Sequence, residues 1–323
     1  MAKAAVYYET GAPDVFRYED VPDPEVFAGG VVLDVEAISI EGGDTLNRAG
    51  GEMTSTPHIV GYQCAGTITE VGEGVTDRHV GQRVVTTMIS GSHAWTVRNF
   101  AMLTWPIPEG ADLIACACVP IPFGTAHDCL FEFGHLQKGE TVLIQAGADG
   151  VGLAAIQLAK RAGATVFATA SNDERLARLT EFGMDHGINY SQSEWVQQVR
   201  ELTDGRGVDL VVDSVGGKTL EASVNALAYR GRVSWVGNAG REMQPPVIAP
   251  IMGKNATITG VFLGAEFSAS PQRTRAMIEA LLRDVARGEL KVVIDREFPL
   301  SEAAAAHAYI ESRSVFGRVL LVP

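Results

Sequence analysis

Residues 143–152, with the sequence LIQAGADGVG, decide how this chain folds. The segment passes from an apolar, strand-like run through a turn of small residues into a helix-like run. Gly147, Gly150 and Gly152 have the spacing G-x-x-G-x-G. Small residues let the backbone approach a pyrophosphate, and the start of a helix offers free N–H groups at the positive end of its dipole. Glycines with this spacing also occur in ordinary tight turns, so the neighbouring sequence has to decide.

The sequence around this turn has the order of one strand–helix–strand unit. Apolar runs typical of strands occupy residues 141–145 and 165–170, and a helical pattern over 151–162 lies between them. The unit has the length found in dinucleotide-binding folds. We therefore predict a dinucleotide site at this turn. The alternative is a plain strand–helix turn that binds nothing.

Composition sets the class of the protein. The chain has 323 residues, 46% of them hydrophobic and 20% charged, which is typical of a globular protein with two domains. Its net charge of −13 argues against nucleic-acid and acidic membrane partners. No apolar run is long enough to span a bilayer, and the N-terminal sequence does not resemble a signal peptide. The four cysteines form no C-x-x-C pair, so we expect a cytoplasmic protein.

The pattern along the chain predicts two domains, one inserted into the other. Residues 1–121 are β-rich, and the final stretch, with segments at 292–298, 301–312 and 317–322, resembles them. An amphipathic helix is expected over 271–287. Between these parts, strands alternate with helices such as 193–202 and 219–227. The expected strands lie at 141–145, 165–170, 187–189, 208–213, 232–236 and 257–263. This order predicts a doubly wound parallel sheet in a nucleotide domain over 122–263, within a substrate domain made of 1–121 and 264–323.

Several motifs outside the glycine turn share one family resemblance. They include DTLNR at residues 44–48, PHIVGYQCAG at 57–66, VGEGV at 71–75, DSVGG at 213–217 and GRVL at 317–320. With these motifs the chain resembles the medium-chain dehydrogenases/reductases, in the zinc-free branch of quinone oxidoreductases and enoyl reductases. The resemblance implies an α/β protein with a Rossmann-type doubly wound parallel sheet and a β-rich GroES-like catalytic domain. It also implies a homodimer paired through the edge strand at 257–263.

The zinc ligands of the zinc-containing relatives are absent from the matching positions. Those relatives have a cysteine shortly before Asp44, where this chain has Gly42 and Gly43. They have a His-Glu pair where this chain has Tyr62 and Gln63. A catalytic zinc needs about three imidazole, thiolate or carboxylate ligands. We therefore predict no metal; the alternative is a rebuilt site that uses Cys64, His93 or His127.

The segment after residues 165–170 bears on which nicotinamide cofactor is used. NAD-preferring sites place an acidic residue there, whereas this chain has Ser171 and then Arg175, which suit a 2′-phosphate. The resemblance adds Tyr190 and Arg313 as residues that line the phosphate in NADPH-dependent relatives. We predict NADPH; in the alternative, NADH, Asp173 would bind the ribose.

Further cofactor contacts are expected at the glycine turn and at the ends of the strands. In the turn itself, Asp149 would repel a pyrophosphate, so we expect its side chain to cap the following helix. Ligands of parallel sheets bind beyond the carboxyl ends of the strands. The expected contacts are Thr125, Gly147, Ala148, Gly150, Val151, Val215, Gly237, Asn238, Phe262 and Leu263.

The predicted reaction is hydride delivery from NADPH to a quinone or an α,β-unsaturated carbonyl, which needs less help than alcohol oxidation. The resemblance places Asp44, Arg48, Tyr62 and Gln63 toward the substrate. Tyr62 is interpreted as a proton donor or, alternatively, as a side chain that fills the space of the missing metal. Asp44 and Arg48, four residues apart, are expected to form an ion pair. Alternative functions are a carbonyl reductase or alcohol dehydrogenase of this superfamily, and a non-catalytic NADPH-binding protein.

Overall fold

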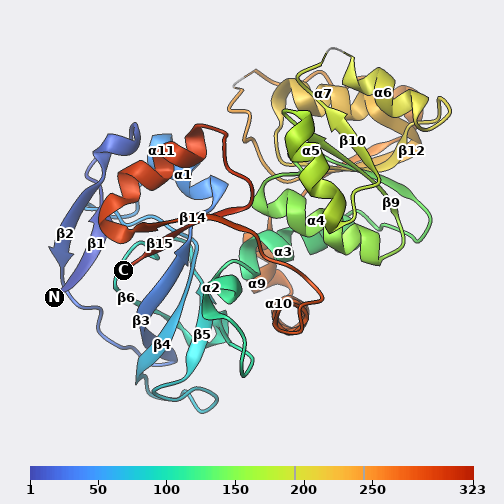
Figure 1. Cartoon of the computed structure of the whole chain (residues 1–323). Coiled ribbons are helices and arrows are strands. Elements are labelled where there is room, and N and C mark those ends of the chain that lie inside the picture. Colours follow the sequence, from blue (N-terminus) through green and yellow to red (C-terminus); the bar gives the residue numbers. More distant parts are fainter. Residues whose placement is uncertain (193, 243) are drawn as a thin grey trace. The chain divides into compact units, whose positions relative to one another are not determined.

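The computed structural model describes residues 1–192, 194–242 and 244–323. The chain forms two compact units (Figure 1). One consists of residues 1–121 and 264–323, and the other of residues 122–263. Ser193, at the start of the helix expected over 193–202, lies outside the described residues; the helix observed there is α6 (Trp195–Glu201). None of the helices in the described part of the chain is long and apolar enough to cross a membrane.

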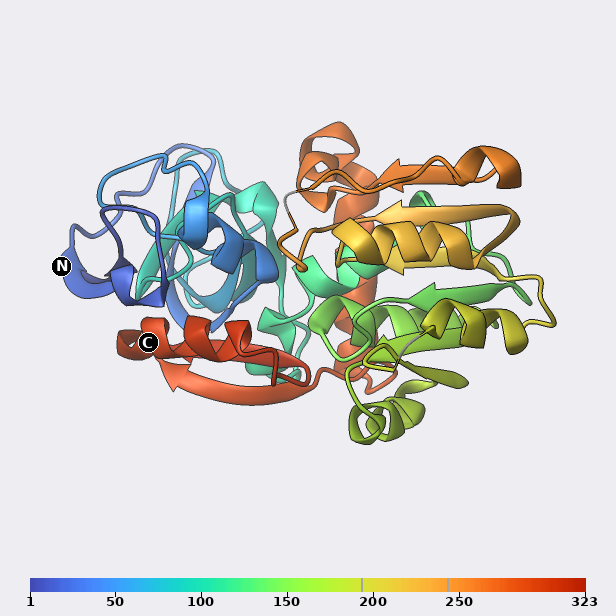
Figure 2. The same cartoon turned by 90° about the horizontal axis from the view of Figure 1, so that it is seen from above.

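The unit of residues 122–263 is built on a six-stranded sheet whose strands run side by side (Figure 2). All neighbouring pairs are parallel, in the order β10-β9-β8-β11-β12-β13. The strands are β8 (Thr141–Ile144), β9 (Thr165–Ala170), β10 (His186–Asn189), β11 (Val208–Asp213), β12 (Leu227–Trp235) and β13 (Thr257–Gly260). The chain starts in the middle of the sheet, builds one half and then the other. This is the order of a Rossmann-type sheet, so the predicted fold is confirmed.

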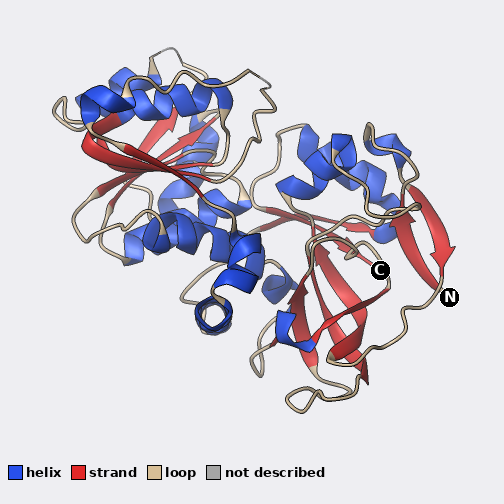
Figure 3. Ribbon diagram, turned by 180° about the vertical axis from the view of Figure 1, so that it is seen from behind, coloured by secondary structure: helices blue, strands red, loops and turns tan. Residues whose placement is uncertain are grey.

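Helices cover both faces of this sheet (Figure 3). They are α3 (Pro120–His127), α4 (Gly150–Arg161), α5 (Asp173–Leu179), α6 and α7 (Gly217–Ala226), with a short α8 (Ile251–Lys254) before β13. Two of the helices begin at capping side chains, Asp149 for α4 and Asn172 for α5, each accepting a backbone N–H of the first turn. A π-helical turn, Asp128–Glu132, continues α3.

Two predicted strands of this sheet differ from the structure by more than one residue, while those expected at 141–145 and 187–189 differ by a single residue. The strand expected over 257–263 ends at Gly260, and Leu263 begins helix α9 (Leu263–Ala269). Val261 and Leu263 are buried while Phe262 is exposed, so the alternation typical of a strand continues beyond the ladder. The strand expected over 232–236 begins earlier, at Leu227. Arg230 has a φ of 64°, and the register with β11 shifts in this part of the strand. The side chains of the first half therefore do not follow the regular alternation by which a strand is recognised in the sequence.

The unit of residues 1–121 and 264–323 is built mainly from β-strands. A two-stranded sheet pairs β1 (Ala2–Val6) with β2 (Arg17–Val21). A seven-stranded sheet has the order β14-β15-β3-β4-β5-β7, with β6 (Thr96–Phe100) also on β3. Its other strands are β3 (Gly30–Ser39), β4 (Gln63–Val71), β5 (Arg83–Thr87), β7 (Thr104–Pro106), β14 (Ile294–Pro299) and β15 (Arg318–Val322). Because β15 pairs with β3, the end of the chain adds a strand to a sheet that begins at residue 30.

Helices of this unit accompany the sheet, and the last of them shares its core. They are α1 (Gly42–Gly50), α2 (Leu113–Ala117), α9, α10 (Pro271–Ala286) and α11 (Ala303–Glu311). The amphipathic prediction for 271–287 is confirmed, since α10 buries Thr274, Met277, Ile278, Leu281 and Leu282 at helical spacing. One apolar cluster joins β1, β3 and β4 to β15 and α11. The N-terminal and C-terminal parts of the chain therefore fold around a common core.

Candidate functional site

The glycine turn between β8 and α4 presents unpaired backbone donors. Asp149 is the N-cap of α4, and its Oδ1 accepts the Gly152 N–H at 2.6 Å, so the predicted capping role is confirmed. Among the described residues, nothing accepts the N–H groups of Ala148, Gly150 and Val151. Three free N–H groups at the start of a twelve-residue helix form a site for an anion such as a pyrophosphate.

Close packing explains two of the glycines of the turn, Gly147 and Gly152. A Cβ on Gly152 would lie 2.3 Å from the carbonyl oxygen of Ala146, and one on Gly147 would lie 2.9 Å from Leu179 Cδ1. The first contact is with backbone, which cannot move aside cheaply. The helix therefore starts directly against the turn, with its donors facing the space beyond β8.

The structure places Ser171 and Tyr190 beside the end of β9, and Arg175 in the first turn of the following helix, α5. The Tyr190 N–H donates to Ala170 O at 3.1 Å, and the Ser191 hydroxyl donates to Ser171 O at 2.7 Å. The Arg175 guanidinium has no hydrogen-bond or ion-pair partner within the described ranges, so it is available to a ligand.

Two further residues are predicted for this end of the cofactor, Arg313 for the phosphate and Asp173 for the ribose in the NADH alternative. Asp173, the ribose ligand of the NADH alternative, accepts Asn189 Nδ2 at 2.8 Å and is thereby held toward β10. Arg313 belongs to the other unit, just after α11, where it is exposed with a φ of 59°.

The remaining predicted cofactor contacts lie at strand ends or on α3. Val215 follows β11, and its N–H donates to Asp213 Oδ1 at 2.9 Å. Gly237 and Asn238 follow β12, while Phe262 is 74% exposed after β13. Two others have buried side chains, Thr125 on α3 and Leu263 at the start of α9, so Leu263 has only its backbone to offer a ligand.

A buried polar cluster surrounds Gln63 in the other unit. The Gln63 side chain is fully buried; its Nε2 donates to Glu41 Oε1 at 2.6 Å and its Oε1 accepts the Ile121 N–H at 3.0 Å. Arg318, on β15, forms a buried ion pair with Glu41 and also binds Ser39 Oγ at 2.7 Å. Burial raises the pKa of Glu41, and the adjacent guanidinium opposes that shift. Gln63 is thus held within the cluster by both ends of its amide.

Tyr62 lies beside this cluster and next to the start of α1. Its ring covers Gly43, where a Cβ would approach Tyr62 Cε2 to 2.4 Å. Asn47 Nδ2 donates to the Tyr62 hydroxyl oxygen at 2.7 Å, which leaves the hydroxyl hydrogen free to be donated. Burial, with the nearby Asp44 charge, raises the pKa of Tyr62 to about 12, so the hydroxyl stays protonated at neutral pH.

The predicted ion pair between Asp44 and Arg48 is wrong. Arg48 is buried, pairs with Glu311 on α11 and donates to Gly11 O at 2.5 Å. Asp44 Oδ2 accepts the Glu41 N–H at 2.8 Å and so caps α1, while its Oδ1 has no partner. The Asp44 carboxylate binds the backbone at the start of its own helix. The Arg48 guanidinium therefore pairs with the carboxylate of Glu311, which is distant in sequence. Burial raises the pKa of Asp44 well above its usual range.

The residues at the expected zinc positions do not fit a zinc ion. Gly42 and Gly43 supply no ligand, the Tyr62 ring fills the space over Gly43, and both ends of the Gln63 amide are bonded within the protein. In the part of the chain that the structure describes, no group of three or more His, Cys, Asp and Glu side chains could hold a metal. The rebuilt site that Cys64, His93 or His127 would supply is therefore not formed by the described residues.

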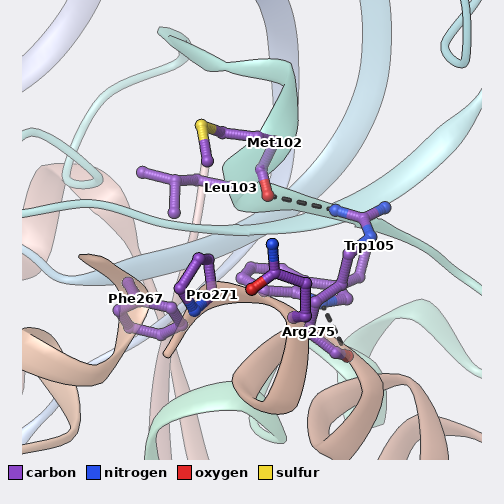
Figure 4. Close-up of a pocket in the computed structure, with 7 residues that line it drawn as sticks. Met102, Leu103, Trp105, Phe267, Pro271 and Arg275 are labelled. Atoms are coloured by element: carbon purple, nitrogen blue, oxygen red, sulfur yellow. Dashed lines mark hydrogen bonds between the residues drawn. The ribbon is translucent and has the colours of Figure 1, made fainter. Parts of the chain in front are cut away.

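One pocket, of about 210 Å³, lies within the unit of residues 1–121 and 264–323 (Figure 4). It is lined by Met102, Leu103, Trp105, Phe267, Pro271, Gln272 and Arg275. Arg275 Nη1 donates to Met102 O at 3.0 Å, its Nε pairs with Glu279, and Trp105 Nε1 donates to Arg275 O at 3.3 Å. Because these polar groups are already engaged, the pocket offers a ligand mainly apolar contacts.

Sequence reasoning missed Arg318 as a member of the site. The available signal was an arginine at the start of the apolar segment RVLLV. An arginine in a buried strand needs a carboxylate partner, so this residue indicated a buried ion pair. Its partner Glu41 is 277 residues away in the chain, which no local pattern indicates. The polar residues in the interior of the parallel sheet were missed as well.

Comparison with known proteins agrees with this architecture. Residues 28–104 match the family model of the alcohol dehydrogenase GroES-like domain, and residues 150–283 match that of zinc-binding dehydrogenases. A 2-haloacrylate reductase from Burkholderia sp. is 33% identical, over 100% of this chain and 99% of that protein. The quinone oxidoreductase of Rattus norvegicus is 30% identical, over 100% and 98%. The structure of Escherichia coli quinone oxidoreductase complexed with NADPH has a TM-score of 0.93, with 26% identity over the full length of both chains.

A Rossmann-type sheet combined with a GroES-like unit defines a two-domain dehydrogenase or reductase. The chain belongs to the medium-chain dehydrogenase/reductase superfamily, in its zinc-independent quinone oxidoreductase branch. The family resemblance and the fold class predicted from the sequence are both confirmed.

Proposed function

We propose that this protein transfers hydride from NADPH to quinones or α,β-unsaturated carbonyls without a catalytic metal. The coarser statement, that the chain is an NADPH-dependent oxidoreductase, follows from its family and from relatives solved with NADPH. The observation that carries the finer proposal is the replacement of the zinc ligands by Tyr62 and by Gln63, whose amide is bonded within the protein at both ends. The relative named for reducing 2-haloacrylate supports a substrate with an activated double bond.

The residues of the glycine turn and of the β9 end fit NADPH. The free N–H groups of Ala148, Gly150 and Val151 would hold the pyrophosphate. We assign the 2′-phosphate to Ser171, Arg175 and Tyr190, because Arg175 is the unpaired cation of that group and can donate two parallel hydrogen bonds to a phosphate. Thr125, Val215, Gly237, Asn238, Phe262, Leu263 and Arg313 remain further proposed contacts.

In the proposed reaction NADPH supplies the hydride, and the protein orients and polarises the acceptor carbonyl. Tyr62 is the proposed donor to the carbonyl oxygen, since Asn47 occupies its oxygen and leaves its hydrogen free. A hydroxyl with a pKa of about 12 stays protonated and can donate as negative charge develops on the acceptor oxygen. Asp44, Arg48 and Gln63 act through the position of α1 and Tyr62, because all three are buried and bonded within the protein.

We also propose that the protein is a cytoplasmic homodimer. Strand β13 is the last strand of the parallel sheet, so one side of its backbone ladder is unpaired, and unpaired edges are usually covered in native proteins. Exposed apolar side chains occur in this part of the chain, with Val247, Met252 and Phe262 each more than 60% exposed. The four cysteines are free thiols, which suits a reducing compartment.

The test is NADPH oxidation by the purified protein with a panel of quinones, enones, enoyl thioesters and ketones. We expect turnover of quinones or of activated alkenes and little turnover of simple ketones. Turnover of ketones alone would favour the carbonyl reductase alternative. NADPH binding with no turnover of any acceptor would favour the non-catalytic alternative.

A further inference from the structure

A chain of polar side chains runs through the interior of the parallel sheet. Thr169 lies on β9, Gln145 directly follows β8, Ser223 is on α7 and Asp213 ends β11. Each of the four side chains is at most 2% exposed. Polar groups in such a place are costly unless they are hydrogen-bonded, so their partners need an explanation.

The four side chains are bonded to one another in a single direction. Thr169 Oγ1 donates to Gln145 Oε1 at 2.9 Å, and Gln145 Nε2 donates to Ser223 Oγ at 3.0 Å. Ser223 Oγ in turn donates to Asp213 Oδ2 at 2.7 Å. Each hydroxyl therefore accepts one hydrogen bond and donates one, and the sequence of donors ends on a carboxylate. Hydrogen bonds aligned in this way strengthen one another.

The two end members of this series, Thr169 and Asp213, each accept backbone N–H groups of the loops beyond the sheet. The Ala146 N–H donates to Thr169 Oγ1 at 3.1 Å, and the N–H groups of Val215 and Gly216 donate to Asp213 Oδ1 at 2.9 and 2.8 Å. Ala146 and Gly216 have positive φ values of 52° and 75°. For alanine this conformation is uncommon and costs free energy unless the surroundings hold it.

The two loops held in this way belong to the proposed cofactor site. One contains the free N–H groups of Ala148, Gly150 and Val151, and the other contains Val215. Asp149 links them further, because Ser214 Oγ donates to its Oδ2 at 3.4 Å. We propose that Thr169, Gln145, Ser223 and Asp213 are positioning residues that fix both loops in the NADPH-binding conformation. This inference rests on the NADPH-binding part of the proposed function and on no particular acceptor.

The test compares variants that remove a hydroxyl from this series of hydrogen-bonded side chains with a variant that removes a hydroxyl elsewhere in the sheet. Ser223→Ala and Thr169→Val each remove one buried hydroxyl from the hydrogen-bonded series. Ser234→Ala, on β12 of the same sheet, removes an equally buried hydroxyl that donates to Cys129 O at 2.7 Å and touches neither loop. The dissociation constant of NADPH is measured by fluorescence titration, and the melting temperature is recorded without and with NADPH.

We expect Ser223→Ala and Thr169→Val to weaken NADPH binding roughly tenfold, since each breaks the series of hydrogen bonds that holds the two loops. Ser234→Ala is expected to lower the melting temperature similarly and to leave the dissociation constant within about twofold. The inference would be overturned if Ser223→Ala and Thr169→Val both left NADPH affinity unchanged, or if Ser234→Ala weakened NADPH binding as much as they do. Failure of the wild-type protein to bind NADPH would overturn the cofactor assignment together with it, whereas failure to turn over quinones or enones would touch only the proposed reaction.

Discussion

Acidification is expected to destabilise this protein through a buried pair of histidines. His93 and His307 are fully buried, and their Nε2 atoms lie 3.1 Å apart, a distance that requires one of them to be an unprotonated acceptor. Phe16 packs against both rings, and no carboxylate is bonded to either ring among the described residues. Burial lowers the pKa of His93 to about 3, and burial together with His93 and Arg48 lowers that of His307 well below its usual value.

The sign and size of the effect follow from linkage. Because the folded-state pKa lies below the unfolded value of about 6.5, the unfolded chain takes up the proton first. The contribution of these histidines to the unfolding free energy is therefore complete above the unfolded pKa and is lost as the pH falls toward the folded pKa. Between pH 7 and pH 5, one histidine with a folded pKa of about 3 costs roughly 2 kcal/mol of unfolding free energy.

The assay is urea unfolding at pH 7 and pH 5, with the wild type compared to the double variant His93→Phe/His307→Phe. Replacing both partners by apolar rings removes the titration without leaving an orphaned nitrogen. We expect the wild type to lose at least about 2 kcal/mol more than this variant between the two pH values, because His93 alone contributes that amount and His307 adds to it in the same direction. His79→Gln, at an exposed position, is the control and should behave like the wild type. Equal pH dependence in the wild type and the double variant would refute the reasoning.

Four further outcomes are expected. Tyr62→Phe should lower turnover by roughly 10²–10⁴-fold with little change in NADPH affinity or melting temperature; unchanged turnover would reduce Tyr62 to a space-filling role. Arg175→Ala should weaken NADPH roughly ten- to a hundredfold and leave NADH nearly unaffected, whereas Arg178→Ala on the same helix should change neither titration. Elemental analysis should find no stoichiometric zinc, and chelators should leave turnover unchanged; one tightly held zinc lost together with activity would contradict this. Light scattering should give a dimer at micromolar concentration, and a monomer would exclude pairing through β13.

The nucleotide unit could be predicted from the sequence because its signals are local. The glycine spacing, the apolar runs and the capping residue Asp149 all act within a few residues of the element that they determine, and β9 and β11 have the predicted bounds. Where a prediction was wrong, the local signal was ambiguous. Phe262 and Leu263 continue an alternating pattern after the backbone has left the sheet, so β13 is shorter than the pattern indicates.

The polar cluster around α1 could not be predicted in this way. Asp44 and Arg48 have the spacing of a helical ion pair, yet Arg48 binds Glu311, which is 263 residues away. Arg318 reaches Glu41 only because β15 pairs with β3. Such partners are set by tertiary structure, which brings Glu311 to Arg48 and Glu41 to Arg318, and not by nearness in the sequence.

The same cluster explains why the absence of zinc ligands is more than the loss of single residues. In zinc relatives a carboxylate stands at the position of Gln63. Here the Gln63 amide donates to Glu41, so a glutamate at this position would place a second carboxylate against a buried one. Arg318 already pairs with Glu41, and the Tyr62 ring occupies the space over Gly43. A zinc site would therefore require Glu41, Tyr62 and Gln63 to change together, and this requirement supports the proposal of metal-free chemistry.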